Sequence, residues 1–105
     1  RAVLTDMNQP LGTHVGNTLE VIESVELLKT GSGAPDLKEI TLQLCAHMLE
    51  SSKAVRTLAQ GRKLASEMLS NGSAWKKFQE MVDAQGGSLK HLNDLSLFEK
   101  APTII

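Results

Sequence analysis

Apolar residues recur at helical spacing through the middle of the chain, in four stretches that are separated by glycine, proline or asparagine. The pattern predicts helices over about residues 17–30, 36–52, 57–70 and 73–85. In the second stretch the apolar positions cover more than half of the helix circumference, which is more than a surface helix needs. We therefore expect a mostly helical segment in which the second helix is the buried one.

Polar residues at the starts of these stretches predict how the helices begin. Side chains with an oxygen that can accept a hydrogen bond from the first turn are favoured there, and a glutamate or glutamine three residues later completes a capping box. The residues with this placement are Asn17 with Glu20, Asp36, Thr57 with Gln60, and Ser73. Glycine follows three of the four stretches and supplies the left-handed residue that commonly ends a helix.

The two ends of the chain follow a different pattern. Residues 1–5 and 101–105 are short apolar runs that suit strands, residues 6–16 read as a glycine-bearing loop, and residues 86–100 have no clear period. Unpaired apolar strands at both ends are unusual for an isolated domain. We expect a piece of a larger chain, with about four helices flanked by short terminal strands.

Composition argues against several classes of partner. The 105 residues include 11 basic and 12 acidic side chains, and only 3% are aromatic. Without a basic field or aromatic stacking platforms, no nucleic-acid partner is expected, and without an apolar run of about 18 residues no membrane partner is expected. The single cysteine, Cys45, cannot form an internal disulfide, so we expect a reducing, cytoplasmic location.

Few residues have the spacing of a known catalytic or metal site. The histidines, His14, His47 and His91, lie far apart and lack the HExxH spacing of a zinc site, and we interpret His47 as a core or boundary residue. No nucleophile elbow or phosphate-binding P-loop is present in the sequence. Glu23 and Glu26 lie on one helical face and could share a site, although a solvated acidic turn explains them at least as well.

The stretch 5–26, TDMNQPLGTHVGNTLEVIESVE, resembles the pyrimidine-nucleoside and thymidine phosphorylases, in which a D-M-x-Q-P-L-G segment leads into V-G-N-A-L-E-V. Residues from about 4 to 87 match this family in order, which is a stronger signal than a lone motif. The resemblance implies a two-domain pentosyltransferase of nucleoside salvage that splits pyrimidine nucleosides with inorganic phosphate into the free base and a (deoxy)ribose 1-phosphate. This chain would be an internal segment of the larger α/β domain.

The resemblance also implies part of a monovalent-cation site. Similar enzymes hold a potassium-like ion near the phosphate loop through main-chain carbonyls and one helix carboxylate, at positions that correspond to Leu11, His14 and Glu23. Oxygen ligands suit such a hard cation. The family's phosphate- and base-binding residues belong to earlier parts of its chains, so we expect no catalytic or cofactor-binding residue here and no activity from the segment alone. Its expected partners are the remaining segments of the phosphorylase. The complete enzyme would form a homodimer.

Two alternatives stay open. The chain could be a non-catalytic helical interaction module derived from the enzyme, which would fold cooperatively as a monomer. It could also come from a related phosphoribosyltransferase with the same fold, although the D-M-N-Q-P-L-G motif favours the phosphorylase.

Overall fold

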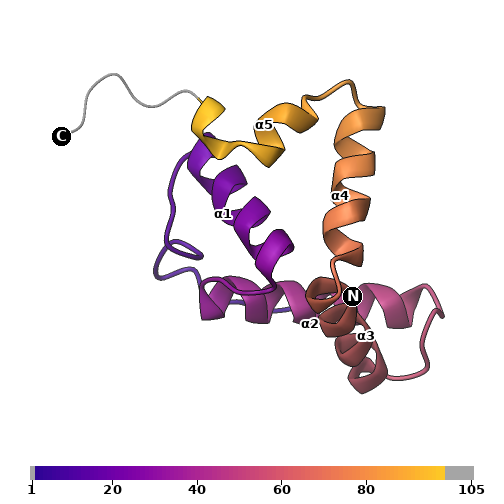
Figure 1. The fold of residues 1–105 in the computed structure, drawn as a ribbon. Helices are drawn as coiled ribbons and strands as arrows, with labels where there is room; N and C mark the ends of the chain where they lie inside the picture. The colour runs from indigo at the N-terminus through magenta and orange to yellow at the C-terminus, as the bar shows by residue number, and fades with distance from the viewer. Residues whose placement is uncertain (1, 99–105) are drawn as a thin grey trace.

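The computed structural model describes residues 2–98, which form five α-helices and one short 3-10 helix (Figure 1). These elements are α1 (Asn17–Thr30), α2 (Pro35–Ser51), α3 (Leu58–Ser70), α4 (Ser73–Ala84), α5 (Leu89–Asn93) and the 3-10 helix η1 (Leu95–Leu97). The first four helices lie where the apolar pattern predicts them, and their ends differ from the prediction by at most one residue. None of the described helices is long and apolar enough to cross a membrane.

The terminal strands are not borne out among the described residues. Residues 2–5 have no regular secondary structure, and the strand predicted over 101–105 lies outside the described residues. A strand needs a neighbour whose backbone groups pair with its own, and residues 2–5 form no backbone hydrogen bond with another described residue. The prediction of an irregular segment over 86–100 is wrong where α5 and η1 lie, because helices this short carry too few residues for a period to register.

Polar side chains cap fewer helices than their spacing predicts. The cap of α3 is confirmed, because the Thr57 hydroxyl oxygen accepts a hydrogen bond from the Gln60 amide at 3.2 Å. The side-chain caps predicted at Asn17, Asp36 and Ser73 are wrong, since α1, α2 and α4 have no side-chain N-cap. The carboxylate of Glu20 does reach back as predicted, because its Oε1 accepts a hydrogen bond from the Gly16 amide at 3.1 Å. The residues that precede these three helices are Gly16, Ala34 and Gly72. Asp36 therefore lies inside the first turn of α2, where its carboxylate is available for a contact outside its own helix.

The helices pack around a small core. α2 and α3 cross and pack closely against each other, α1 and α4 rise from the same side of this pair, and α5 bridges their far ends (Figure 1). The buried hydrophobic residues include Val25, Leu27, Leu42, Ala46, Leu69 and Leu92. The close approach of α2 and α3 depends on Gly61, because a Cβ atom there would lie 2.8 Å from the carbonyl oxygen of Ala46.

α2 is less buried than its wide apolar face predicts. Leu42 and Ala46 are buried, whereas Leu44 and Met48 are 42% and 62% exposed. The expectation of a buried helix is met on only part of its circumference, because the described residues leave these two side chains open to solvent.

Lys29 ties α1 to the last helices. Its ammonium group donates a hydrogen bond to the Leu92 carbonyl at 2.6 Å and lies 4.9 Å from the centre of a Trp75 ring. A cation over an aromatic face is attracted by the negative potential of the ring. One side chain therefore joins α1, α4 and α5 at their common contact.

Candidate functional site

The loop that precedes α1 is held against that helix by the carboxylate of Glu23, which is only 6% exposed. Its Oε1 accepts hydrogen bonds from the Thr13 amide at 2.8 Å and from the Thr13 hydroxyl at 2.9 Å. Its Oε2 accepts a hydrogen bond from the His14 amide at 3.2 Å. A carboxylate removed from water needs such partners, because burial without them is strongly unfavourable. Glu23 therefore determines the path of the loop over α1.

The same contacts keep Glu23 ionised. The hydrogen bond from the Thr13 amide contributes most to lowering the pKa of the Glu23 carboxyl, and burial opposes it. The Thr13 hydroxyl, the His14 amide and the charge of the nearby His14 ring lower this pKa further. The net effect is a pKa below the ordinary value, so the carboxylate carries its negative charge at neutral pH.

A second carboxylate holds the loop from the side of α2. Oδ2 of Asp36 accepts a hydrogen bond from the Gly12 amide at 2.9 Å, and Oδ1 accepts one from the Leu37 amide at 2.9 Å. The contact with Gly12 contributes most to lowering the pKa of the Asp36 carboxyl. Two carboxylates on two helices thus bind three consecutive amides, those of residues 12–14.

The turn between these contacts requires glycine at position 12. Gly12 has a φ of 74°, in the left-handed region that other residues rarely adopt. A Cβ atom there would lie 2.6 Å from Oε2 of Glu23. The Glu23 carboxylate therefore occupies the space that any larger residue would need.

The three residues predicted to bind a cation border one hollow. Leu11, His14 and Glu23 all line a space of about 280 Å³ between the loop and the starts of α1 and α2. The ring Nδ1 of His14 lies 3.6 Å from Oε2 of Glu23 and 3.0 Å from the Thr13 hydroxyl oxygen. The residues that share this lining are Pro10, Val15, Glu20, Ser24 and Leu37.

The oxygen atoms near this hollow suit a hard monovalent cation. Glu23 Oε2 accepts a single main-chain hydrogen bond, at 3.2 Å, so this ionised oxygen keeps a free lone pair. Carboxylate and carbonyl oxygens are the ligands that hard cations prefer. Among residues 2–98, no group of three or more His, Cys, Asp or Glu side chains could hold a metal ion. A cation at this place would therefore depend on main-chain oxygens in addition to Glu23.

Other residues singled out by the sequence lie apart from this hollow. Glu26 is exposed and does not join Glu23 in its lining. His47 is half-buried, and its Nδ1 has no hydrogen-bond partner among the described residues. His91 pairs with the Ser88 hydroxyl at 2.9 Å and packs its ring edge-on against Phe98. None of the three lines the space beside the loop.

Sequence reasoning missed the part that Thr13 and Asp36 play in the loop. Thr13 stands inside the family-like stretch, but nothing in its spacing from Glu23 indicates a hydrogen bond. Asp36 was predicted as a helix cap, whereas its contact with Gly12 joins residues that are 24 positions apart. Only a signal of spatial contact between distant positions would have revealed this pair.

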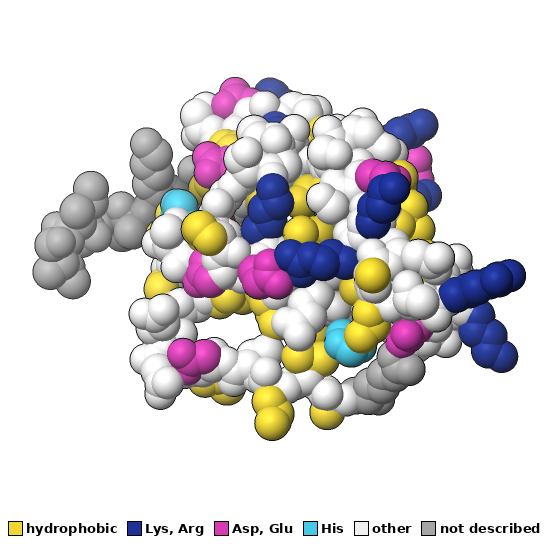
Figure 2. All heavy atoms as spheres, turned by 90° about the horizontal axis from the view of Figure 1, so that it is seen from below, with side chains coloured by type: hydrophobic (Ala, Val, Ile, Leu, Met, Phe, Trp, Pro, Cys, Tyr) yellow, Lys and Arg dark blue, Asp and Glu magenta, His cyan; other side chains and the backbone are white. Residues whose placement is uncertain are grey.

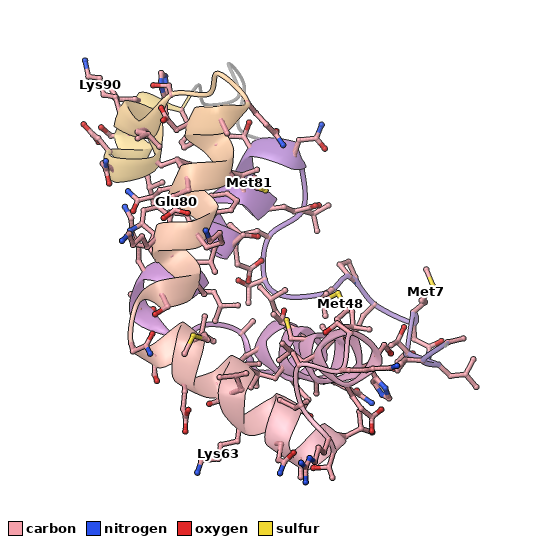
Figure 3. The ribbon with its side chains drawn as sticks, turned by 90° about the vertical axis from the view of Figure 1, so that its right-hand side faces the viewer. Met7, Met48, Lys63, Glu80, Met81 and Lys90 are labelled. Carbon is pink, nitrogen blue, oxygen red and sulfur yellow. The ribbon has the colours of Figure 1, made fainter. Side chains whose placement is uncertain are left out.

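A second, larger hollow of about 920 Å³ lies between residues 4–11 and the first half of α2. Seen from below, the molecule is hollowed and carries hydrophobic side chains on this face (Figure 2). Leu4 and Met7 are 99% and 90% exposed, and Met7 extends away from the helices (Figure 3). The space is open and bordered by side chains that the described residues do not cover.

Comparison with known proteins places the chain in a family. The model described as "Glycosyl transferase family, a/b domain" matches residues 1–75. The pyrimidine-nucleoside phosphorylase of Bacillus subtilis (strain 168) is 40% identical over 100 residues, which are 95% of this chain and 23% of the relative. The protein of the same name from Geobacillus stearothermophilus is 36% identical over 104 residues, which are 99% of this chain and 24% of the relative.

A third relative, the pyrimidine-nucleoside phosphorylase of Staphylococcus aureus (strain COL), is 41% identical over 86 residues, which are 82% of this chain and 20% of the relative. The chain thus spans about a quarter of the length of these curated relatives. The resemblance predicted from residues 5–26 is confirmed. The chain belongs to the glycosyl transferase family with an α/β domain, within which it is similar to the pyrimidine-nucleoside phosphorylases.

Proposed function

We propose that this chain is part of a pyrimidine-nucleoside phosphorylase, a pentosyltransferase. The complete enzyme would move the (deoxy)ribosyl group of a pyrimidine nucleoside to inorganic phosphate and release the free base. The observation that carries the proposal is 40% identity to a protein of this name over 95% of the chain. Because the chain spans about a quarter of such relatives, the other segments would bind the phosphate and the base. This segment would supply scaffold and part of a cation site.

Within this proposal, Leu11 and His14 bind a potassium ion through their main-chain carbonyls, and Glu23 binds it through its carboxylate. The ion supplies a fixed positive charge near the phosphate when it is bound. Support comes from the common hollow that the three residues line and from the lowered pKa that keeps Glu23 charged. The side chains of Leu11 and His14 take no part, which fits the presence of a leucine at one of these positions.

The complete enzyme would act in the cytoplasm, in pyrimidine nucleoside salvage, and as a homodimer. The free thiol of Cys45 supports a reducing compartment. The dimer follows from the family resemblance, in which the contact lies in a part of the enzyme that this segment does not match.

A chimeric enzyme tests the proposal. Residues 1–105 would replace the matching segment of the Bacillus subtilis phosphorylase, and phosphate-dependent release of uracil or thymine would be measured. We expect the chimera to be active and to be stimulated by potassium. A folded chimera that releases no base in the presence of phosphate would refute the assignment.

Two substitutions in the chimera separate the cation site from the scaffold. Glu23→Gln keeps the size of the side chain but removes its charge, so potassium stimulation should be lost. Glu26→Gln changes an exposed carboxylate on the same helix and should leave the stimulation unchanged. Equal stimulation of the two variants would remove Glu23 from the cation site while leaving the phosphorylase assignment intact.

A further inference from the structure

One peptide unit of the loop is oriented by a residue outside it. The Gly12 amide donates to Asp36 at 2.9 Å, and this amide shares its peptide unit with the carbonyl of Leu11. The described residues contain no cis peptide, so the unit is planar and trans and its N–H and C=O point in opposite directions. An N–H that points to Asp36 therefore directs the Leu11 carbonyl away from Asp36.

Glu23 cannot orient the same carbonyl. It binds the amides of Thr13 and His14, and those amides belong to the two following peptide units. Their carbonyls are the ones of Gly12 and Thr13. The left-handed φ of 74° at Gly12 turns the chain between the Gly12 amide and the amides of Thr13 and His14. These neighbouring amides therefore reach carboxylates on different helices. Each carboxylate thus controls a different part of the loop.

We propose that Asp36 is a positioning residue of the candidate cation site, because it fixes the direction of the Leu11 carbonyl through the Gly12 amide. The proposal rests on the cation site of the proposed function, to which Asp36 contributes no ligand. Both of its oxygens accept amide hydrogen bonds, and Asp36 does not line the hollow that Leu11 and Glu23 border. Its place in the first turn of α2 also favours the ionised form, which strengthens the bond to the amide.

The consequence is a coupling between α2 and the ion. The start of α2 and the peptide between Leu11 and Gly12 move as a unit as long as the bond to Asp36 is present. Loss of this bond frees the peptide to rotate, and a carbonyl that samples several directions binds a cation more weakly because it must first be ordered. The contacts of Thr13 and His14 with Glu23 are not affected by that rotation.

The test uses nuclear magnetic resonance of the isotope-labelled chimeric enzyme, in which the Gly12 amide reports both its own exchange and the shift of the Leu11 carbonyl. In Asp36→Ala we expect the Gly12 amide to exchange with solvent about fivefold faster or more, whereas the Thr13 and His14 amides keep their protection. Titration with potassium chloride should shift the Leu11 carbonyl in the unmodified chimera. The midpoint of that shift should move to a several-fold higher concentration in Asp36→Ala.

Glu39→Gln is the matched control. Glu39 lies one turn further along α2 and pairs with Arg62 at 2.6 Å, without contact to the loop amides. It should leave both the Gly12 exchange and the potassium midpoint unchanged. If Asp36→Ala does not fold, Asp36→Asn keeps the shape and one acceptor oxygen without the charge, and it should have a smaller effect in the same direction.

The outcomes separate the two proposals. Unchanged Gly12 exchange in the Asp36 variants would overturn the positioning role, and so would an unchanged potassium midpoint. If potassium shifts no carbonyl of the unmodified chimera, the cation site fails instead. The exchange of the Gly12 amide would still decide whether Asp36 orients the loop.

Discussion

Gly12→Ala is the sharpest perturbation of the loop. It places a side chain at a left-handed backbone position and puts a methyl group where the Glu23 carboxylate already lies. An L-residue in the left-handed region costs about 1–2 kcal/mol. Alanine recovers about 0.4–1 kcal/mol of this by restricting the unfolded chain. In addition, the new methyl group would lie 2.6 Å from Oε2 of Glu23, far inside van der Waals contact.

Gly86→Ala provides a control at nearly the same φ but with no obstacle. Gly86 has a φ of 75°, against 74° at Gly12, and a Cβ atom there meets nothing within 4 Å. The backbone penalty is therefore shared, and the difference between the two variants measures the overlap with Glu23. We expect Gly12→Ala to be less stable than Gly86→Ala by about 1–3 kcal/mol, which is typical of a methyl group forced into occupied space.

Urea denaturation of the two variants, followed by circular dichroism, gives this difference. A further pair of measurements in a Glu23→Ala background identifies its cause, since the shorter side chain removes the atoms that the methyl group would meet. The extra destabilisation by Gly12→Ala should then disappear. Equal stability of Gly12→Ala and Gly86→Ala would refute the reasoning, and so would a difference that persists without the Glu23 carboxylate.

Three further results are expected. Gly61→Ala should destabilise the chain by about 1–3 kcal/mol in urea denaturation despite the better helix propensity of alanine, because its methyl group would lie 2.8 Å from the Ala46 carbonyl oxygen. The pKa of Glu23 is lowered in the folded chain, so the stability that its ionised form contributes is complete above the ordinary value of 4.5 and is lost as the pH falls through the lower folded value. Acid denaturation should therefore depend less steeply on pH in Glu23→Gln. Lys29→Met should raise amide exchange in α5, because the bond to the Leu92 carbonyl is lost.

Each of these variants has a control at an exposed position. Ser66→Ala changes an exposed position of α3 and should alter stability by a few tenths of a kcal/mol at most. Glu26→Gln should leave the pH dependence of the unmodified chain in place, and Lys90→Met, at a lysine that points into solvent, should leave exchange in α5 nearly unchanged (Figure 3). A variant that matched its control would contradict the contact assigned to it.

Thermal unfolding bears on the alternative function. A free-standing interaction module should unfold in one cooperative transition as a monomer, whereas a segment that needs its neighbours in an α/β domain should unfold broadly or aggregate. A sharp, reversible transition of the monomeric chain would favour the module.

The sequence alone determined the features that depend on residues close together along the chain. Helical periodicity located the first four helices, and the glycines at 31 and 72 ended two of them in the left-handed conformation, with φ values of 67° and 81°. The ordered motif within residues 5–26 was enough to indicate the family, and through the resemblance it indicated three residues that share one hollow. These signals are local, because helix hydrogen bonds join residues only four positions apart.

Tertiary structure decided what local patterns cannot encode. The spacing of Asp36 is that of a helix cap, yet its carboxylate binds Gly12 instead, and the acidic turn at Glu23 looks solvated until the loop folds over it. The apolar run at residues 1–5 suits a strand. Residues 2–5 have no partner strand among the described residues, and they form no strand. In each case the outcome depends on which distant group arrives in space, since a strand or a buried carboxylate is stable only when its partners are present.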